Sequence, residues 1–378
     1  MEKERELIIV TGATGFIGAN LCSYLKNKNK EAKTKVLGID IKEPEGEEKP
    51  FDYFLQLDLR KQQSIDTIKE FIINIHKKVN VTKLFHLSAD MGGAEYIFTG
   101  DNDYNILSNN MKINTNICEF YRWLIEEEYH NTILFFSSSA CVYNQEYQLV
   151  NKKEEMKRVG LKEGDIYPAY PDSEYGWEKI IAERLFMSFQ RRNPNARVVI
   201  GRFHNIYGKR HSVSGELEPK KRKVIESLIC KIRQQSVDTD LICKIKQQTV
   251  PDCDVVNESK FRFKVFGDGE QTRSFLHVDV LIETVMKLIE TIHKEPIDNI
   301  VNVGSTECVS IKELIEIISR VLNVKVKEGQ DYEFVKEGNP PVGVYHRNSN
   351  NDKIKEILNG WEPTMSMTLE EGIRKMTL

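Results

Sequence analysis

Residues 7–18 read Leu7-Ile-Ile-Val-Thr-Gly-Ala-Thr-Gly-Phe-Ile-Gly18, and this stretch decides the fold. Its four leading apolar residues predict a buried strand, and the amphipathic segment from Phe16 to about Asn29 predicts a helix. Three glycines stand in the spacing GxxGxxG: Gly12, Gly15 and Gly18. A strand, a glycine-rich turn and a helix in this order bring backbone N–H groups, including those of Phe16 and Ile17, close to a pyrophosphate. We therefore predict that this turn binds a dinucleotide.

Two carboxylates follow at the ends of the next predicted strands. Residues 35–39 form a strand that ends in Asp40, about twenty residues after the glycines, where an acid binds ribose hydroxyls. Because a carboxylate repels a 2′-phosphate, Asp40 favours NAD over NADP, although the nearby Lys42 weakens that argument. A third strand ends in Asp58, which either caps the next helix or reaches the adenine. Both interpretations of Asp58 stay open.

A second stretch, Ile133-Leu-Phe-Phe-Ser-Ser-Ser-Ala-Cys-Val-Tyr143, predicts a strand that ends in hydroxyl and thiol groups. Its apolar start suits a strand covered on both faces of a parallel sheet. Ligands bind at the carboxyl edge of such a sheet, so we expect Ser139 and Cys141 to face a ligand. Tyr175 and Lys179 stand four residues apart, on one face of a predicted helix. We expect these four side chains to surround one ligand.

The residue types at this site suit proton transfer. A tyrosine phenol has a pKa of about 10, and an ammonium one helical turn away, here Lys179, favours its ionised form. A cysteine titrates near pH ~8.5, and a cationic neighbour would bring Cys141 into the neutral range. The alternatives are two exposed helix residues for Tyr175 and Lys179, and a small buried apolar residue for Cys141.

The alternation of predicted strands and helices indicates an α/β fold, a doubly wound parallel sheet of the Rossmann type with a smaller C-terminal substrate-binding lobe. The 378 residues are enough for two domains. We assign 1–205, with about 274–305, to the nucleotide-binding domain, and 206–273 with 306–378 to the lobe. A near-repeat lies in the lobe, Leu228 to Val237 against Leu241 to Val250, and indicates a tandem duplication.

Composition excludes several classes of function. The net charge is -3, which gives no reason to expect a nucleic-acid partner. No apolar run approaches the roughly 20 residues that a membrane helix needs, and the N-terminus does not resemble a signal peptide. The seven cysteines form no CxxC pair, so neither a zinc site nor a disulfide framework is indicated. We expect a cytoplasmic protein without a metal.

Several motifs resemble a known family. The glycine turn and Tyr175-x-x-x-Lys179 resemble the extended short-chain dehydrogenase/reductases, and further segments resemble the GDP-mannose 3,5-epimerases within them. These segments are His86-Leu-Ser-Ala-Asp-Met-Gly-Gly93, Ser138-Ser-Ala-Cys-Val-Tyr143, Gly201-Arg-Phe-His-Asn-Ile-Tyr-Gly208, Gly267-Asp-Gly-Glu-Gln-Thr-Arg-Ser-Phe275 and Arg347-Asn-Ser-Asn350. The resemblance extends over nearly the whole chain.

The resemblance implies a role for each matching residue. Tyr175 would take the proton of the C4 hydroxyl while NAD takes the hydride, with Ser139 bonded to the C4 oxygen. Lys179 would bind the nicotinamide ribose and favour the tyrosinate, and Cys141 and Lys223 would exchange protons at C3 and C5. Further positions match those that hold a GDP-hexose: Gly92, Ser139, Ala140, Cys141, Asn205, Lys223, Lys231, Gln271, Arg273 and Arg347. The resemblance also implies a homodimer.

The sequence departs from the family after Gly208, where Lys209-Arg-His-Ser replaces the usual Pro and Gly-Thr-Trp. Lys220 and Lys221 therefore compete with Lys223 for the role of the acid, and a sugar other than mannose is possible. A C4 epimerase of the UDP-sugar type, a GDP-heptose epimerase, a sugar 4,6-dehydratase and a non-enzymatic NAD-binding sensor are the alternatives. The dehydratase would carry an Asp-Glu pair where Ala140 and Cys141 stand, and a sensor has no use for Ser139, Tyr175 and Lys179 together.

Overall fold

The structure is a computed structural model that describes residues 5–28, 34–75, 79–127, 129–214, 223–234, 262–292, 299–335 and 343–377. Within these ranges, seven parallel strands form one sheet in the order β11-β6-β5-β4-β1-β2-β3. The strands are β1 (Arg5–Thr11), β2 (Thr34–Asp40), β3 (Tyr53–Gln56), β4 (Val79–His86), β5 (Ile133–Ser139), β6 (Arg197–Phe203) and β11 (Ile300–Val303). This order is that of a doubly wound sheet, so the predicted fold class is confirmed.

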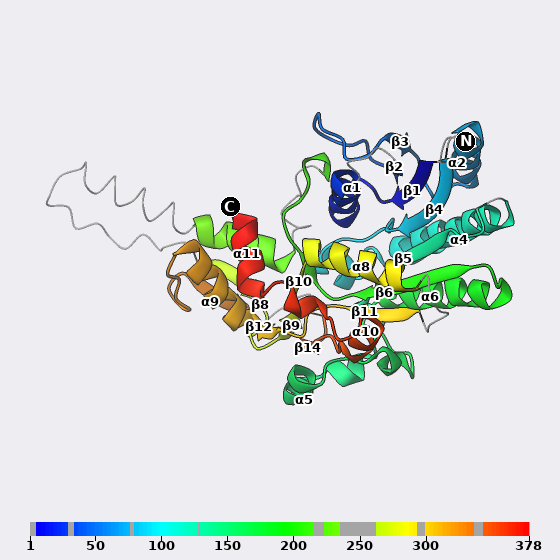
Figure 1. Ribbon diagram of the computed structural model, residues 1–378. Helices are drawn as coiled ribbons and strands as arrows, with labels where there is room; N and C mark the ends of the chain where they lie inside the picture. Colours follow the sequence, from blue (N-terminus) through cyan, green and yellow to red (C-terminus); the bar gives the residue numbers. More distant parts are fainter. Residues whose placement is uncertain are drawn as a thin grey trace, which may run out of the picture.

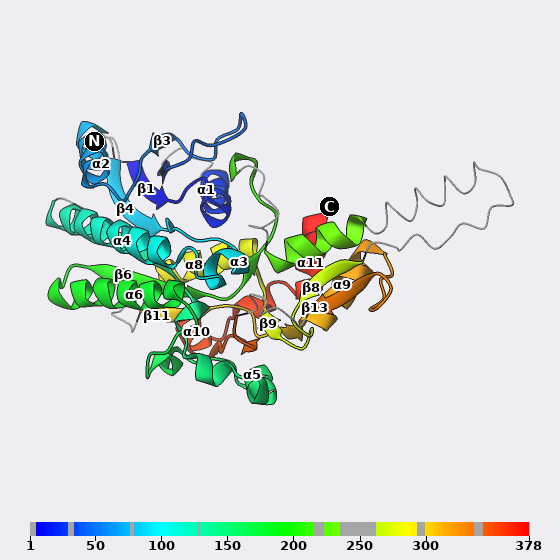
Figure 2. The ribbon, with the colours of Figure 1, turned by 180° about the vertical axis from the view of Figure 1, so that it is seen from behind.

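Helices cover both faces of the sheet (Figures 1 and 2). One face packs under α1 (Phe16–Lys28) and α8 (Val278–Ile292). The other face packs under α2 (Gln62–Ile75), α4 (Asp103–Glu126) and α6 (Glu174–Arg192). Because the central strands are covered on both faces, they carry continuous apolar runs, such as Leu7–Val10 of β1 and Ile133–Phe136 of β5, rather than an alternating pattern.

The chain reverses its direction of travel across the sheet between β1 and β4. The strands after β1 run to one side as β2 and β3, and β4 then pairs with the opposite edge of β1. Thr11 at the end of β1 is the register partner of His86 at the end of β4. In open α/β sheets this switch point is where ligands bind, so the fold positions the site there.

A second hydrophobic core lies beside the sheet, where Figure 1 shows α9 and α11. Its helices are α9 (Ile311–Leu322), α11 (Leu369–Thr377) and a helix over residues 224–234. Its strands are β8 (Phe263–Phe266), β9 (Thr272–Ser274), β12 (Cys308–Ser310), β13 (Tyr332–Val335) and β14 (His346–Arg347). In the helix over 224–234, the apolar stripe of the first repeat copy is buried: Leu228, Ile229 and Ile232. The second copy lies outside the described residues.

Shorter elements connect these layers. They are α3 (Ala94–Phe98), α5 (Lys153–Arg158), α10 (Asp352–Ile357), β7 (Ile206–Tyr207) and β10 (Leu276–His277). None of the helices in the described ranges combines the length and apolar character needed to cross a bilayer.

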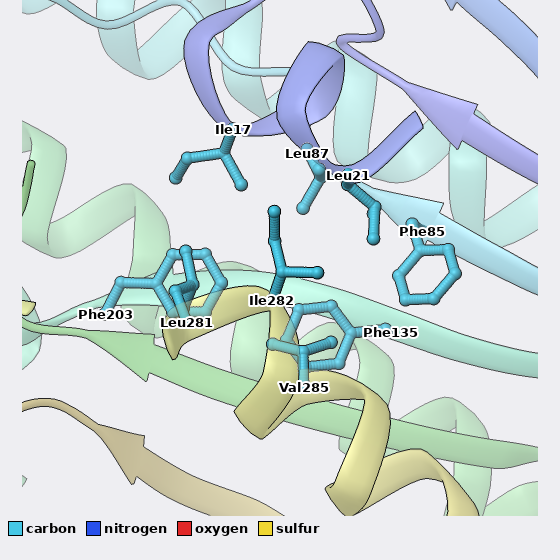
Figure 3. Close-up of a pocket in the computed structure, with 9 residues that line it drawn as sticks. All are labelled: Ile17, Leu21, Phe85, Leu87, Phe135, Phe203, Leu281, Ile282 and Val285. Atoms are coloured by element: carbon cyan, nitrogen blue, oxygen red, sulfur yellow. The ribbon is translucent and has the colours of Figure 1, made fainter. Parts of the chain in front are cut away.

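A small cavity separates α1 and α8 from the sheet (Figure 3). Its volume is about 10 Å³, and its lining is apolar: Ile17, Leu21, Phe85, Leu87, Phe135, Phe203, Leu281, Ile282 and Val285. A space of this size without polar partners does not hold an ordered water. The cavity is therefore a gap in core packing and not a binding site.

Candidate active site

The glycine-rich turn requires glycine at two of its three glycine positions, Gly12 and Gly18. Gly12 has a φ of 71°, in the left-handed region that favours glycine. A Cβ on Gly18 would lie 2.0 Å from the carbonyl oxygen of Gly12. A Cβ on Gly15 would approach only Gly12, at 3.1 Å, and would otherwise fill open space over the first turn of α1. The turn therefore leaves the N–H groups at the start of α1, at Phe16 and Ile17, uncovered for an anion.

Asp40 lies at the end of β2 and faces this turn. Its Oδ2 accepts a hydrogen bond from the backbone N–H of Thr14 at 3.0 Å, and its Oδ1 accepts from Lys42 N at 3.1 Å. These hydrogen bonds fix the carboxylate beside the turn that is predicted to bind the pyrophosphate. The end of the second strand is also where this type of fold binds the ribose of a dinucleotide. The turn and Asp40 together fit NAD.

Asp58 forms a different set of contacts from those predicted. Its carboxylate accepts from Arg60 Nε and Nη2, both at 2.8 Å, and from Arg60 N at 3.1 Å. Helix α2 begins only at Gln62, so this side chain does not cap it. A contact of Asp58 with the adenine stays a prediction.

Ser139 and Cys141 lie where β5 ends, and β5 extends through all three serines. Ser139 Oγ accepts a hydrogen bond from Cys141 N at 3.2 Å, which starts a short 3₁₀ turn over Ala140–Val142. A Cβ on Gly176 would lie 2.3 Å from the carbonyl oxygen of Cys141. The glycine after Tyr175 therefore lets α6 begin directly against this turn, which brings Ser139, Cys141 and Tyr175 together.

Tyr175 is buried against Ile97 and Ile106, with Cys141 at its side. Burial, followed by the charge of Glu178, raises the pKa of Tyr175 well above its ordinary value, while an interaction with Ser139 opposes the rise. The phenol is therefore neutral at pH 7 in this structure. The predicted ionised form is not favoured by the surrounding residues.

Lys179 lies one helical turn further along α6 and is buried. Its Nζ is 3.2 Å from Glu178 Oε1, 4.8 Å from the ring centroid of Phe136 and 5.5 Å from that of Tyr175. The expected pairing of the ammonium with the phenolate is replaced by a contact with Glu178. Burial raises the pKa of Glu178, and the charge of Lys179 lowers it in part.

A buried polar chain connects Glu178 to the glycine turn. Asn114 Nδ2 donates to Glu178 Oε2 at 3.2 Å, and Asn114 Oδ1 lies 2.9 Å from His86 Nε2. His86 Nδ1 in turn lies 2.9 Å from the hydroxyl of Thr11, which ends β1. Burial lowers the pKa of His86 to about 3, so the ring is neutral. His86 is therefore a packed core residue, and this polar chain fixes the ends of β1, β4 and α6 relative to one another.

Arg347 is the cationic neighbour of Cys141. Its Nη1 donates to Cys141 Sγ at 3.3 Å, its Nη2 to Asp172 Oδ2 at 3.0 Å and its Nε to Gln148 Oε1 at 2.7 Å. Burial raises the pKa of Cys141, and the charge of Arg347 works against this rise. Cys141 is therefore a thiol at rest, held beside a cation that would stabilise its thiolate.

Two further predicted substrate residues, Arg273 and Asn205, lie on the lobe side of this cluster. Arg273 is the register partner of Arg347 across β9 and β14, and it donates to the carbonyl oxygens of Thr272 and Tyr345 at 2.9 and 3.0 Å. Burial lowers the pKa of Arg273 to about 10. Asn205 has a φ of 41° and donates to Ser274 O at 2.9 Å, which ties the end of β6 to β9. These contacts join the sheet edge to the lobe.

Gln271 and Gly92 also belong to the predicted substrate set. Gln271 is buried, and its Oε1 accepts no hydrogen bond within the described residues. Gly92 follows β4, and a Cβ there would lie 2.6 Å from Tyr96 Cβ, so only glycine fits. An unsatisfied buried acceptor such as Gln271 Oε1 suits a donor group on a ligand.

Lys223 is not joined to Cys141 by any hydrogen bond or ion pair of the described residues. Its Nζ donates to Ile206 O at 3.1 Å and lies 5.2 Å from the ring centroid of Phe16. Burial lowers the pKa of Lys223 to about 8. Lys231 donates to Lys264 O at 2.9 Å on the lobe surface. The competitors Lys220 and Lys221 lie outside the described residues.

Sequence reasoning did not find Asp172, Gln148 or Glu178. Asp172 stands in a loop and Gln148 in a short 3₁₀ helix, neither of them within a motif, and both belong to the site because they bind Arg347, which comes from the far end of the chain. Glu178 precedes Lys179, and helical spacing alone does not distinguish it from an exposed residue.

A profile of the NAD-dependent epimerase/dehydratase family matches residues 8–304. The chain belongs to this family. GDP-mannose 3,5-epimerase of Arabidopsis thaliana is 33% identical over 369 residues, which cover 97% of this chain and 80% of that protein. The predicted family, the NAD cofactor and the enzyme class, an NAD-dependent sugar-nucleotide epimerase, are confirmed.

Solved structures of the family share the fold. UDP-glucose 4-epimerase of Thermotoga maritima, solved with UDP-glucose, has a TM-score of 0.70 at 18% identity, over 98% of this chain and 97% of that chain. UDP-glucuronic acid 4-epimerase of Bacillus cereus, solved with UDP-glucuronic acid and NAD, has a TM-score of 0.67 at 20% identity, with the same shares covered. At these identities the likeness concerns the fold alone.

Proposed function

We propose that this epimerase acts on a GDP-hexose of the mannose type and inverts C3 and C5 after transient oxidation at C4. The observation that carries the proposal is the Cys141 thiol, which lies in the same turn as Ser139 and 3.3 Å from Arg347 Nη1. A C4 epimerase needs Ser139, Tyr175 and Lys179 and has no use for a thiol held by a guanidinium. The similarity to GDP-mannose 3,5-epimerases over 97% of the chain supports the same substrate class.

Each residue has a role in the proposed reaction. NAD, when bound, supplies the acceptor and donor of the C4 hydride. Ser139 Oγ hydrogen-bonds the C4 oxygen, and Tyr175 Oη, in its ionised form, takes the hydroxyl proton with Lys179 as its neighbouring cation. The C4 ketone makes the protons at C3 and C5 acidic, because their carbanions become enolates. Cys141 Sγ then gives or takes a proton on one face of the ring, and Lys223 Nζ serves the other face.

Heavy water separates this proposal from a C4 epimerase. The protein is incubated in heavy water with a panel of GDP- and UDP-sugars, and NMR locates the incorporated deuterium. We expect deuterium at C3 and C5 of a GDP-hexose. Cys141→Ala should abolish this uptake but keep transient NADH absorbance, and Tyr175→Phe should lose both. The control Cys118→Ala, which removes a thiol of α4 away from the site, should retain both the deuterium uptake and the NADH absorbance.

Two outcomes would contradict the proposal. Inversion at C4 of a UDP-sugar without deuterium at C3 or C5 would indicate the C4 epimerase. Continued deuterium uptake at both C3 and C5 in Cys141→Ala would show that Cys141 has only a packing role.

We also propose the predicted division of the chain, a cytoplasmic location and a homodimer formed through α4 and α6. The separate core of the lobe supports the division into 1–205 with about 274–305, and 206–273 with 306–378. Exposed apolar side chains on these two packed helices support the dimer: Tyr104, Met111, Trp177 and Ile181. Sedimentation of Ile181→Glu should show a monomer, and an unchanged assembly would contradict this interface.

A further inference from the structure

The segment that departs from the family, residues 209–214, lies across the glycine-rich turn. It leaves β7, and Figure 1 shows the chain in green passing beside α1. Asn20 Nδ2 donates to Lys209 O at 3.2 Å, and Ser214 Oγ donates to Gly15 O at 3.3 Å. Glu45 N donates to Val213 O at 3.2 Å, and Val213 is buried. This segment, called the strap below, therefore connects the start of α1 to the loop that follows β2.

Two cations lie close to the first residue of α1: Arg210 of the strap, and Lys223, which directly precedes the helix over residues 224–234. Arg210 Cζ lies 5.9 Å from the ring centroid of Phe16, and Lys223 Nζ lies 5.2 Å from it. The printed partners of both cations are carbonyl oxygens: Arg210 Nη2 donates to Ser214 O at 3.4 Å, and Lys223 Nζ to Ile206 O at 3.1 Å. Among the described residues neither forms an ion pair, and the buried Arg210 Nε has no hydrogen-bond partner.

This arrangement has more positive than negative charge. Glu226 is the carboxylate whose charge acts on both cations, and it accepts a hydrogen bond from Lys223 N at 3.3 Å. Burial lowers the pKa of both Arg210 and Lys223, which shows that their charged forms lack compensation here. A dianion at this place would supply it, and a guanidinium binds phosphate oxygens through two parallel hydrogen bonds.

We propose that Arg210 binds the pyrophosphate of the NAD dinucleotide from the side opposite the glycine-rich turn. The N–H groups at the start of α1 hold one side of the anion, and the strap closes the other. Two ligands of this enzyme class carry a pyrophosphate, the dinucleotide and the nucleotide sugar. The strap contacts Gly15, Asn20 and Glu45, which belong to the dinucleotide half of the fold, so the dinucleotide is its ligand.

Binding measurements on the full chain, freed of NAD, test the assignment. Calorimetry compares the wild type, Arg210→Gln and the control Lys209→Gln, which removes an exposed charge from the same strap. The ligands are NAD, ADP-ribose, AMP and GDP. We expect Arg210→Gln to weaken the binding of NAD and of ADP-ribose by about tenfold or more, because each ligand loses a charge-assisted hydrogen bond. AMP, which has no pyrophosphate, and GDP should bind as before, and Lys209→Gln should match the wild type.

Other results would overturn the proposal. Weakened GDP binding with unchanged NAD and ADP-ribose would assign Arg210 to the nucleotide sugar. Equal losses of NAD affinity in Arg210→Gln and Lys209→Gln would indicate only a long-range effect of the positive charge on the strap, which salt screens. If Arg210→Gln does not fold, Arg210→Lys keeps the charge but loses the planar fork. That variant should still bind NAD more weakly than the wild type, and wild-type affinity would contradict the assignment.

Discussion

Two substitutions beside Cys141 should shift the acidity of its thiol in opposite directions. Arg347→Met removes the cation whose Nη1 donates to Cys141 Sγ at 3.3 Å, so the pKa of Cys141 should rise. Asp172→Asn removes the carboxylate that lies 3.0 Å from Arg347 Nη2 and keeps a hydrogen-bond acceptor of the same shape. Because the charge of Asp172 raises the pKa of Cys141, this substitution should lower it.

The distances set the size of the two shifts. At 3.3 Å and an effective dielectric of about 20, two unit charges interact by about 5 kcal/mol, which is an upper bound for the thiolate and Arg347. Opposite charges this close usually shift a pKa by about 1–3 units, so Arg347→Met should raise the pKa of Cys141 by that amount. Asp172 acts from beyond the guanidinium, so the shift in Asp172→Asn should be about 1 unit or less.

Alkylation measures the thiolate directly. The rate of modification of Cys141 by iodoacetamide is followed by peptide mass spectrometry from about pH 6 to pH 10, a range that brackets an ordinary thiol. Each substitution leaves a buried charge without its partner and should cost about 3–5 kcal/mol of stability, so thermal unfolding must first show a folded protein. Cys141→Ala supplies the blank. Shifts in the same direction for both variants would refute the electrostatic explanation.

Three further predictions concern the fold and the cofactor. Asp40→Ala should weaken NAD binding by about tenfold and reduce its preference over NADP, measured by calorimetry; unchanged selectivity would contradict a ribose contact. Glu183→Gln breaks the buried pair with Arg202, whose Nη2 and Glu183 Oε2 lie 2.8 Å apart, and should lower the free energy of unfolding by about 3–5 kcal/mol. As a control, Glu370→Gln breaks an exposed pair with Arg374, whose Nη2 lies 3.1 Å from Glu370 Oε1, and should change the free energy of unfolding by less than about 1 kcal/mol. His86 has a folded pKa of about 3 and an unfolded pKa of about 6.5, so the unfolded chain binds more protons between these values. Stability should therefore fall as the pH drops from about 6.5 to 3, and His86→Gln should reduce this slope in urea unfolding curves; an unchanged slope would exclude His86 as its source.

The sequence by itself determined the local elements and the identity of several site residues. The apolar run before Gly12 predicted β1, and the spacing of Tyr175 and Lys179 predicted one helix face, because neighbours within a strand or helix are also neighbours along the chain. The glycine spacing predicted the dinucleotide turn for the same reason. These patterns need no information from distant residues.

Tertiary structure alone decided which groups act on each other. Arg347 reaches Cys141 across 206 positions, and the strap reaches Gly15 across 199. Lys179 Nζ contacts Glu178 and does not pair with a Tyr175 phenolate, and helical spacing does not predict which of these two contacts forms. The pKa of Tyr175 is set by burial, which depends on α3 and α4 covering it. Hydrogen bonds and desolvation act over a few ångströms in space, and separation along the chain does not report that distance.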